Sequence, residues 1–118
     1  MFAAHNKIDN LISTVDINGQ QIDGPTNKVL NLGNIRAKFD AFGWQTLEMD
    51  GNNMDEVLKC LDEAKKMTRK GRPIGIMMKT VMGKGVDFME NDHNWHGIAP
   101  NDEQLARALA QLPATADY

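Results

Sequence analysis

The sequence predicts an α/β fold in which helices cover a parallel sheet. Segments with strand patterns alternate with segments that have helical patterns, as is typical of parallel strands joined by right-handed crossovers. Residues 73–81, PIGIMMKTV, open with consecutive apolar positions, as expected of a strand buried on both faces of such a sheet. Residues 54–69 carry apolar side chains on one helical face, which would cover the sheet.

Length and composition indicate one ordinary globular domain and exclude several function classes. The 118 residues suffice for one modest core, and 42% hydrophobic and 25% charged residues are usual values. A net charge of -3 and the lack of a basic, aromatic-rich cluster argue against nucleic acid as a partner. No apolar run approaches the roughly 20 residues that span a bilayer, and MFAAHNKIDN lacks a signal-peptide pattern. We therefore expect no membrane partner and a cytoplasmic location.

The N-terminal half is expected to contain two strands separated by a helix. Residues 11–16, LISTVD, have the pattern of a short strand that ends in a carboxylate, and the composition of residues 18–26 is typical of turns. Asn34 is expected to cap a helix that ends before Gly43. Residues 44–49, WQTLEM, alternate like a strand with one solvated face. The apolar face of the helix consists of Ile35, Phe39 and Phe42.

The central helix is expected to run from about Met54 to Arg69 and to stop at Gly71. Asn53 and Glu56 have the spacing of a capping box. The stripe expected to pack on the core consists of Met54, Val57, Leu58, Leu61 and Ala64. Cys60 is the single cysteine, so it forms no internal disulfide, and we expect it to be a structural thiol.

The C-terminal part is expected to be a long loop followed by one helix. Loops as long as residues 82–100 are often functional in small domains. Asn101 and Gln104 have capping-box spacing, and Pro113 is expected to end the helix. Its core-facing residues are expected to be Leu105, Leu109 and Leu112. No repeat or internal boundary is visible, so we predict a single domain over residues 1–118.

Two polar segments follow predicted strands, where ligands bind in open parallel sheets. The first, VDINGQQIDG at 15–24, offers the side-chain and backbone oxygens that magnesium prefers, although Asn-Gly and Asp-Gly are also common turn formers. The second, at 79–97, contains Lys79, the sequence Gly-Lys-Gly and two histidines. Lysine and close-approaching glycines suit a phosphate, and His96 suits proton transfer. The alternatives are a flexible turn and a packed histidine beside Trp95.

Four stretches together resemble transketolases. They are VDINGQQIDGPT, AFGWQTLEMDGNN, KTVMGKGVDFMEN and WHGIAPND, and they occur in the family's order at similar separations over nearly the whole chain. The resemblance implies a three-layer αβα sandwich with a parallel sheet, the thiamine-diphosphate-binding fold. It also implies an enzyme that transfers a two-carbon ketol unit between sugar phosphates in the pentose phosphate pathway, with thiamine diphosphate and Mg2+ as cofactors.

The resemblance assigns roles to five positions. Asn18 would bind magnesium through its side chain and Gln20 through its backbone carbonyl. Ile22 would pack against the cofactor. Lys79 and His96 would lie near the diphosphate or the reacting centre, and His96 is the expected catalytic residue. Lys84 and His93 match less well and are left out of the predicted site.

One element of the family pattern is missing from this sequence. The family's Gly-Asp-Gly motif, whose Asp is the first magnesium ligand, does not occur in these 118 residues. We therefore expect a domain truncated at its N-terminal side, the C-terminal part of the pyrophosphate-binding domain. Expected partners are the remaining transketolase domains or subunits, with self-association through exposed sheet edges. The chain alone is expected to be inactive.

Two alternatives stay open at this point. The chain could be a non-catalytic remnant or partner module that keeps the fold without binding the cofactor. It could also belong to related enzymes, the deoxyxylulose-phosphate synthases or dehydrogenase components, although the last two stretches fit transketolase better.

Overall fold

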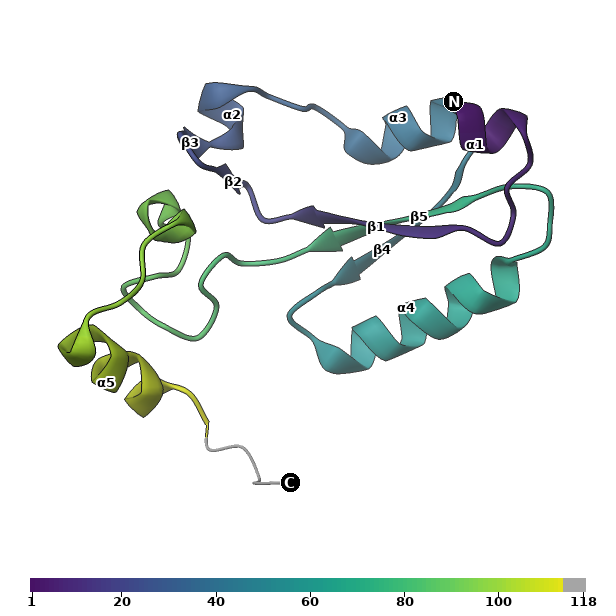
Figure 1. Cartoon of the computed structure of the whole chain (residues 1–118). Coiled ribbons are helices and arrows are strands. Elements are labelled where there is room, and N and C mark those ends of the chain that lie inside the picture. Colours follow the sequence, from purple (N-terminus) through teal and green to yellow (C-terminus); the bar gives the residue numbers. More distant parts are fainter. Residues whose placement is uncertain (114–118) are drawn as a thin grey trace. The chain divides into compact units, whose positions relative to one another are not determined.

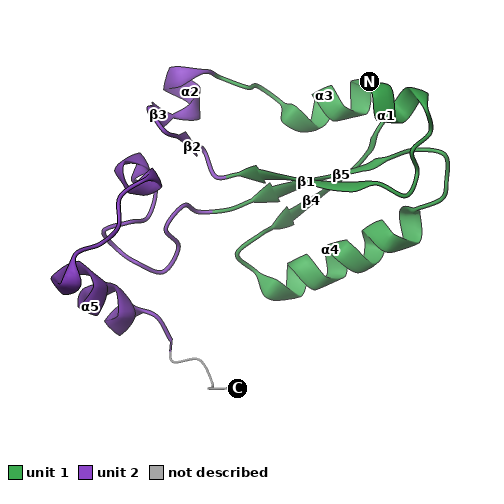
Figure 2. Ribbon diagram, viewed as in Figure 1, with its two compact units in different colours: residues 1–17, 31–80 green, residues 18–30, 81–118 purple. Residues whose placement is uncertain are grey.

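The computed structural model describes residues 1–113, which form two compact units (Figure 2). The first unit consists of residues 1–17 and 31–80. The second consists of residues 18–30 and the described residues from 81 onward. The prediction of a single domain over residues 1–118 includes residues 114–118, which lie outside the described part. It stays a prediction.

The first unit is built on a parallel sheet of three strands. These are β1 (Ile12–Ile17), β4 (Gln45–Asp50) and β5 (Ile74–Lys79), and β5 lies between the other two. Each of the first two strands matches a predicted one to within one residue at either end, and β5 lies inside the predicted segment 73–81. Because both pairings are parallel, all three strands end at the same edge of the sheet.

Helices cover both faces of this sheet and make three layers (Figure 1). The short helix α1 (Phe2–His5) and α3 (Ile35–Ala41) lie on one side, and α4 (Met54–Met67) lies on the other. The predicted αβα sandwich with a parallel sheet is therefore confirmed. Asn34 caps α3 as predicted, because its side chain accepts a hydrogen bond from the Ala37 amide at 2.9 Å.

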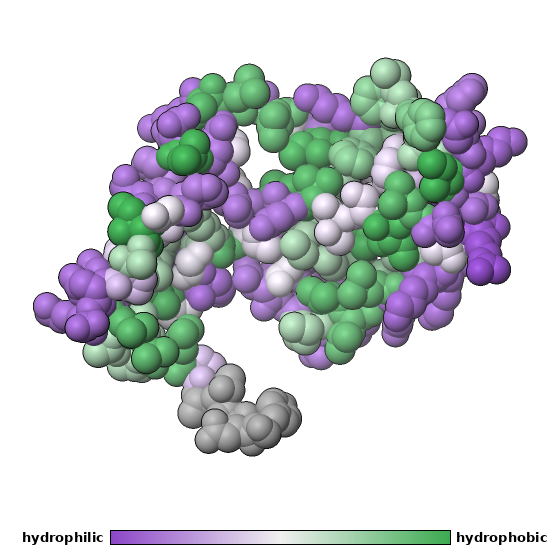
Figure 3. Space-filling model, viewed as in Figure 1, coloured by the Kyte–Doolittle hydropathy of each residue, from purple (hydrophilic) through white to green (hydrophobic). Residues whose placement is uncertain are grey.

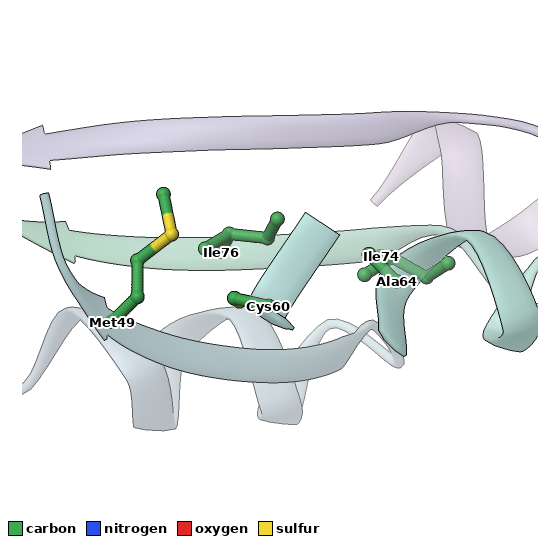
Figure 4. Close-up of a cluster of buried hydrophobic side chains, with 5 residues drawn as sticks. All are labelled: Met49, Cys60, Ala64, Ile74 and Ile76. Atoms are coloured by element: carbon green, nitrogen blue, oxygen red, sulfur yellow. The ribbon is translucent and has the colours of Figure 1, made fainter. Parts of the chain in front are cut away.

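The central strand is buried on both faces, as its sequence predicts. Ile74 and Ile76 are fully buried and pack with Met49 of β4 and with Cys60 and Ala64 of α4 (Figure 4). The opposite face carries Gly75 and Met77. A β-carbon at Gly75 would lie 2.9 Å from Phe39 Cδ1, so the small residue lets α3 approach the sheet closely.

The helix α4 begins as predicted but lacks a complete capping box. Asn53 Oδ1 accepts hydrogen bonds from the amides of Asp55 and Glu56 at 3.1 and 3.3 Å. The Glu56 carboxylate, however, accepts from the Asp50 amide at 3.0 Å instead of the Asn53 amide. The reciprocal half of the box is thus replaced by a bond to the end of β4.

The helix also ends two residues earlier than predicted. Met67 is its last residue, and Arg69 adopts a left-handed conformation with φ of 60°. Asp9 determines this ending, since its backbone carbonyl accepts from the Arg69 amide at 2.8 Å and its carboxylate accepts from the Gly71 amide at 3.0 Å. These bonds to a residue far away in sequence are invisible to a local pattern.

Part of the predicted core stripe of α4 is wrong. Met54 is 67% exposed and Leu58 is 57% exposed. At 3.6 residues per turn, Leu58 lies about 100° around the helix from Val57, which takes it to the edge of the packed face. The helix contacts the core instead through Val57, Cys60, Leu61, Ala64 and Met67.

The second unit contains a two-stranded hairpin and three short or medium helices. Strands β2 (Gln20–Gln21) and β3 (Gly24–Pro25) pair antiparallel. They are followed by α2 (Thr26–Val29), the 3-10 helix η1 (His93–His96) and α5 (Asp102–Gln111).

The predicted capping box of α5 is confirmed, but its predicted core face is wrong. Asn101 and Gln104 exchange side-chain-to-amide hydrogen bonds of 2.9 Å in both directions. Leu105, Leu109 and Leu112 are 45%, 61% and 42% exposed, whereas Ala108 is buried. The helix contacts the preceding loop through Arg107 and Gln111, which bind Asp87, while Leu112 lies close to Gly85 and still stays partly exposed. Exposed hydrophobic residues therefore occur in both units (Figure 3).

Within residues 1–113, no helix is long and apolar enough to cross a membrane.

Truncating Ile76 to Ala should destabilise the first unit by about 2–5 kcal/mol, because it leaves a cavity where a fully buried side chain packed. Urea unfolding followed by circular dichroism measures this loss. Leu58→Ala is the matched control, with an expected change within about 0.5 kcal/mol because Leu58 lies at the surface. Equal effects of the two substitutions would contradict this description of the core.

Candidate functional site

The turn after β1 is held by its own side chains. Asn18 Oδ1 accepts a hydrogen bond from the Gln20 amide at 2.9 Å. The Gly19 carbonyl accepts from the Thr26 amide and hydroxyl at 2.9 and 3.2 Å, which closes the hairpin segment on itself. The turn-former interpretation therefore holds, and it leaves the second lone pair of Asn18 Oδ1 for another donor or a cation.

Gln20 and Ile22 lie in the hairpin that follows this turn. The Gln20 side-chain oxygen is buried and has no hydrogen-bond partner among the described residues. Ile22 occupies the hairpin turn between β2 and β3, where its side chain is 65% exposed. An apolar side chain at an exposed turn is available to contact an apolar part of a ligand.

His96 is the last residue of η1 and is exposed. Asp92 caps η1 by accepting hydrogen bonds from the backbone and side-chain nitrogens of Asn94 at 3.0 and 2.7 Å. The packed residue in this segment is Trp95, whose indole Nε1 donates to the Phe88 carbonyl at 2.8 Å. The exposure of His96 does not fit the alternative of a histidine packed beside Trp95.

The second unit brings four of the five predicted site residues into neighbouring segments. Strand β2 contacts η1, so the hairpin that carries Gln20 lies against the helix that carries His96. Ile22 directly follows β2, and Asn18 precedes it by one intervening residue, Gly19. Two loops separated by some 70 residues in sequence thus meet, as expected for segments that follow neighbouring strands.

The fifth predicted residue, Lys79, belongs to the first unit. It is the last residue of β5 and lies opposite Ile17 and Asp50 in the sheet register. Its ammonium is 3.9 Å from the Glu48 carboxylate, which also lies 3.6 Å from the Arg36 guanidinium. A hollow of about 160 Å³ at this edge includes all three of these charged side chains in its lining.

The Gly-Lys-Gly sequence forms a turn that closes on Glu90. The Gly85 amide donates to the Glu90 carboxylate at 3.0 Å, and Lys84 pairs with the same carboxylate at 3.5 Å. The Gly85 hydrogen bond, with a smaller contribution from Lys84, lowers the pKa of Glu90. Gly83 has φ of 69°, and a β-carbon there would meet the Met89 backbone. This favours the turn interpretation and agrees with leaving Lys84 out of the site.

A polar cluster around Asp87 was not predicted. Asp87 accepts hydrogen bonds from Arg107 at 2.6 Å and from the Gln111 side chain at 2.9 Å, while its own amide donates to Gln111 at 2.8 Å. The Gln111 hydrogen bond and then the Arg107 hydrogen bond lower the pKa of Asp87. These partners are 20 and 24 residues away in sequence, so no local pattern could reveal them.

These residues do not form a complete magnesium site. Asn18 and Gln20 offer neutral oxygens only, and magnesium is normally held through one or two carboxylates. The described residues contain no group of three or more His, Cys, Asp or Glu side chains that could hold a metal ion. The residues present therefore fit as part of a magnesium site and not as the whole of one.

A family profile described as "Transketolase, thiamine diphosphate binding domain" matches residues 1–115. The chain belongs to this transketolase family. The resemblance found in four stretches of the sequence is thereby confirmed over almost the full length of this transketolase domain.

Two relatives of this transketolase domain are named as parts of transketolases. The domain is 36% identical over 112 residues to the 6-deoxy-6-sulfo-D-fructose transketolase subunit SqwG of Clostridium sp. (strain MSTE9), covering 95% of this chain and 40% of that protein. It is 35% identical over 106 residues to one of the apulose-4-phosphate transketolase subunits of Phocaeicola vulgatus, covering 90% of this chain and 37% of that protein. The chain thus spans about two fifths of the length of these relatives.

The same fold occurs in a solved transketolase. The crystal structure of transketolase from Campylobacter jejuni matches with a TM-score of 0.83 and 31% identity, over 93% of this chain and 17% of that one. Human transketolase is 32% identical over 112 residues, covering 93% of this chain and 17% of its own length. In each case the matching region is one part of a longer protein.

Acid should weaken the attachment of α5 to the loop around Asp87. The lowered pKa of Asp87 means that its contribution to stability is present above the unfolded-state value of about 4 and is lost as the pH falls through the lower folded-state value. Hydrogen exchange of α5 amides, followed from about pH 6 down to about pH 3, measures this loss. Asp87→Asn should flatten the transition, and an identical acid response in both proteins would contradict the assignment.

Proposed function

We propose that this chain is part of a transketolase that transfers a two-carbon ketol unit between sugar phosphates with thiamine diphosphate and magnesium. The observation that carries the proposal is the contact between β2 and η1 within a domain of the transketolase family. This contact supports a site in which the turn at Asn18 and the exposed His96 serve one ligand. A cytoplasmic location stays a prediction.

Each of the five residues has a role in this proposal. The side-chain oxygen of Asn18 and the backbone carbonyl of Gln20 would supply two neutral ligands to magnesium. Ile22 offers an exposed apolar contact for the cofactor. Lys79 would supply positive charge for the diphosphate, and its ammonium lies 3.9 Å from the Glu48 carboxylate.

His96 holds or releases a proton near the reacting centre. Its exposure allows that role, since a proton donor must reach the substrate within hydrogen-bonding distance. Thiamine diphosphate, when bound, supplies the nucleophilic carbon of the reaction. The chain itself contributes orientation, charge and proton handling.

Two observations support the proposal that the site requires further domains or subunits. The Asp of the family's Gly-Asp-Gly motif is missing from this sequence, and the relatives are longer than this chain. Two relatives carry the word subunit in their names, and this chain covers 40% and 37% of them. We therefore propose that the remaining transketolase parts complete both the magnesium site and the cofactor site.

A non-catalytic partner module is the second candidate. The observation in its favour is that residues 1–113 hold no carboxylate-containing metal cluster. The binding experiment below separates the two, because a module without a cofactor role gains no affinity when the missing parts are added.

These 118 residues alone should bind thiamine diphosphate with magnesium more weakly than micromolar, because the metal lacks its anionic ligand. Isothermal titration measures the affinity. When a polypeptide carrying the missing family segments is added, binding and ketol transfer should appear. Micromolar or tighter binding by the chain alone would refute the incomplete site, and no gain on completion would favour the non-catalytic module.

Within that completed assembly, Asn18→Ala should weaken magnesium-dependent binding by roughly tenfold or more. Asn31→Ala is the matched control, because Asn31 Oδ1 accepts the Gly33 amide at 2.8 Å in a turn of the same kind as that of Asn18. A similar loss of affinity in both variants would show that Asn18 acts only by stabilising its turn.

Self-association is expected because β1 and β4 each have one edge without a strand partner in the described part of the chain. Light scattering at high protein concentration should detect dimers or larger species. Thr14→Lys, which adds a charge to an exposed position of β1, should reduce them. A single monomeric species at all concentrations would contradict this prediction.

A further inference from the structure

The second unit has very little apolar core to hold its long loop in place. Among the described residues of this unit, Val86 and Ala108 are the buried hydrophobic side chains, at 6% and 7% exposure. Two small side chains bury too little area to fix a segment of this length by the hydrophobic effect. Other contacts must therefore order the segment that carries His96.

Arg107 makes two of these contacts. From α5 it forms a hydrogen-bonded ion pair of 2.6 Å with Asp87. Its guanidinium carbon also lies 4.7 Å from the centre of the Phe88 ring. A planar guanidinium makes both interactions at once, which an ammonium does less well. Gln111, one turn along the helix, adds two hydrogen bonds to Asp87.

Phe88 connects this contact to η1. Its ring meets the Trp95 ring edge-on with centres 5.4 Å apart, and its carbonyl accepts the Trp95 indole N–H at 2.8 Å. Trp95 directly precedes His96, and η1 in turn lies against β2. A continuous series of contacts thus leads from Arg107 through Phe88 and Trp95 to the predicted site.

We propose that Arg107 is a positioning residue, which acts through Asp87, Phe88 and Trp95 to hold η1, and with it His96, against the β2 hairpin. Its effect on catalysis rests on the proposed function. Its effect on the order of η1 does not, so the two can be tested separately.

Hydrogen exchange of the Trp95 indole N–H in this chain reports the order of η1 by NMR. Arg107→Ala should accelerate that exchange about tenfold and broaden the ring-proton signals of His96, because both an ion pair and a cation–π contact are lost. Arg107→Lys, which keeps the charge, should give an intermediate rate. Amide exchange in β5, which belongs to the first unit, should stay unchanged.

Arg36→Ala is the matched control, because Arg36 also pairs with carboxylates at 3.6 and 3.8 Å but lies in the first unit. It should leave the Trp95 exchange rate within about twofold of the unsubstituted chain, because residues without shared partners act independently. An Arg107→Ala rate inside that same range would overturn the proposal. If Arg107→Ala unfolds α5, the Trp95 exchange rate is measured instead in Asp87→Asn, which preserves side-chain size. That rate then decides whether the contact orders η1.

In the completed assembly, Arg107→Ala should lower kcat with a smaller change in KM, and Arg107→Lys should restore part of it. If Arg107→Ala disorders η1 but leaves kcat unchanged, the positioning role is overturned. If the unsubstituted assembly shows no ketol transfer, the proposed function fails while the NMR result still decides whether Arg107 orders η1.

Discussion

Parallel pairing of β5 with a strand on each side is the constraint on which the first unit depends. A parallel strand that is central in its sheet needs apolar cover on both faces, and α4 and α3 provide it. Ile74 and Ile76 meet α4 on one face, and Gly75 admits Phe39 on the other. The same pairing brings the carboxyl ends of three strands to one edge, from which β1 and β5 lead into the segments with the candidate site.

The two units achieve order by different means. The first has a contiguous apolar core between sheet and helix, whereas the second relies on capping bonds, an ion pair and ring contacts. Hydrogen bonds and ion pairs at the surface compete with water, so each contributes modestly. A segment held in this way can adjust to a ligand more readily than one locked in a core, and ligand-binding segments are often drawn from such regions.

The sequence named the candidate site residues, and the structure shows which of the segments that carry them lie together. Turn-forming residues and the order of the strands indicated that the loops after β1 and β5 would carry it. The contact of β2 with η1 and the exposure of His96 came from the structure. Asp87 and its partners escaped prediction because they belong to a loop and a helix far apart in sequence.

By itself, the sequence determined the type and order of the main elements, since hydrophobic periodicity and capping residues act over a few positions. It also determined the family, because four long stretches match in order. Only tertiary structure decided which helical faces are buried and where α4 ends. Leu58 and Leu105 lie at the surface because burial depends on the position of the neighbouring element, and Asp9 ends α4 through bonds that join distant parts of the chain.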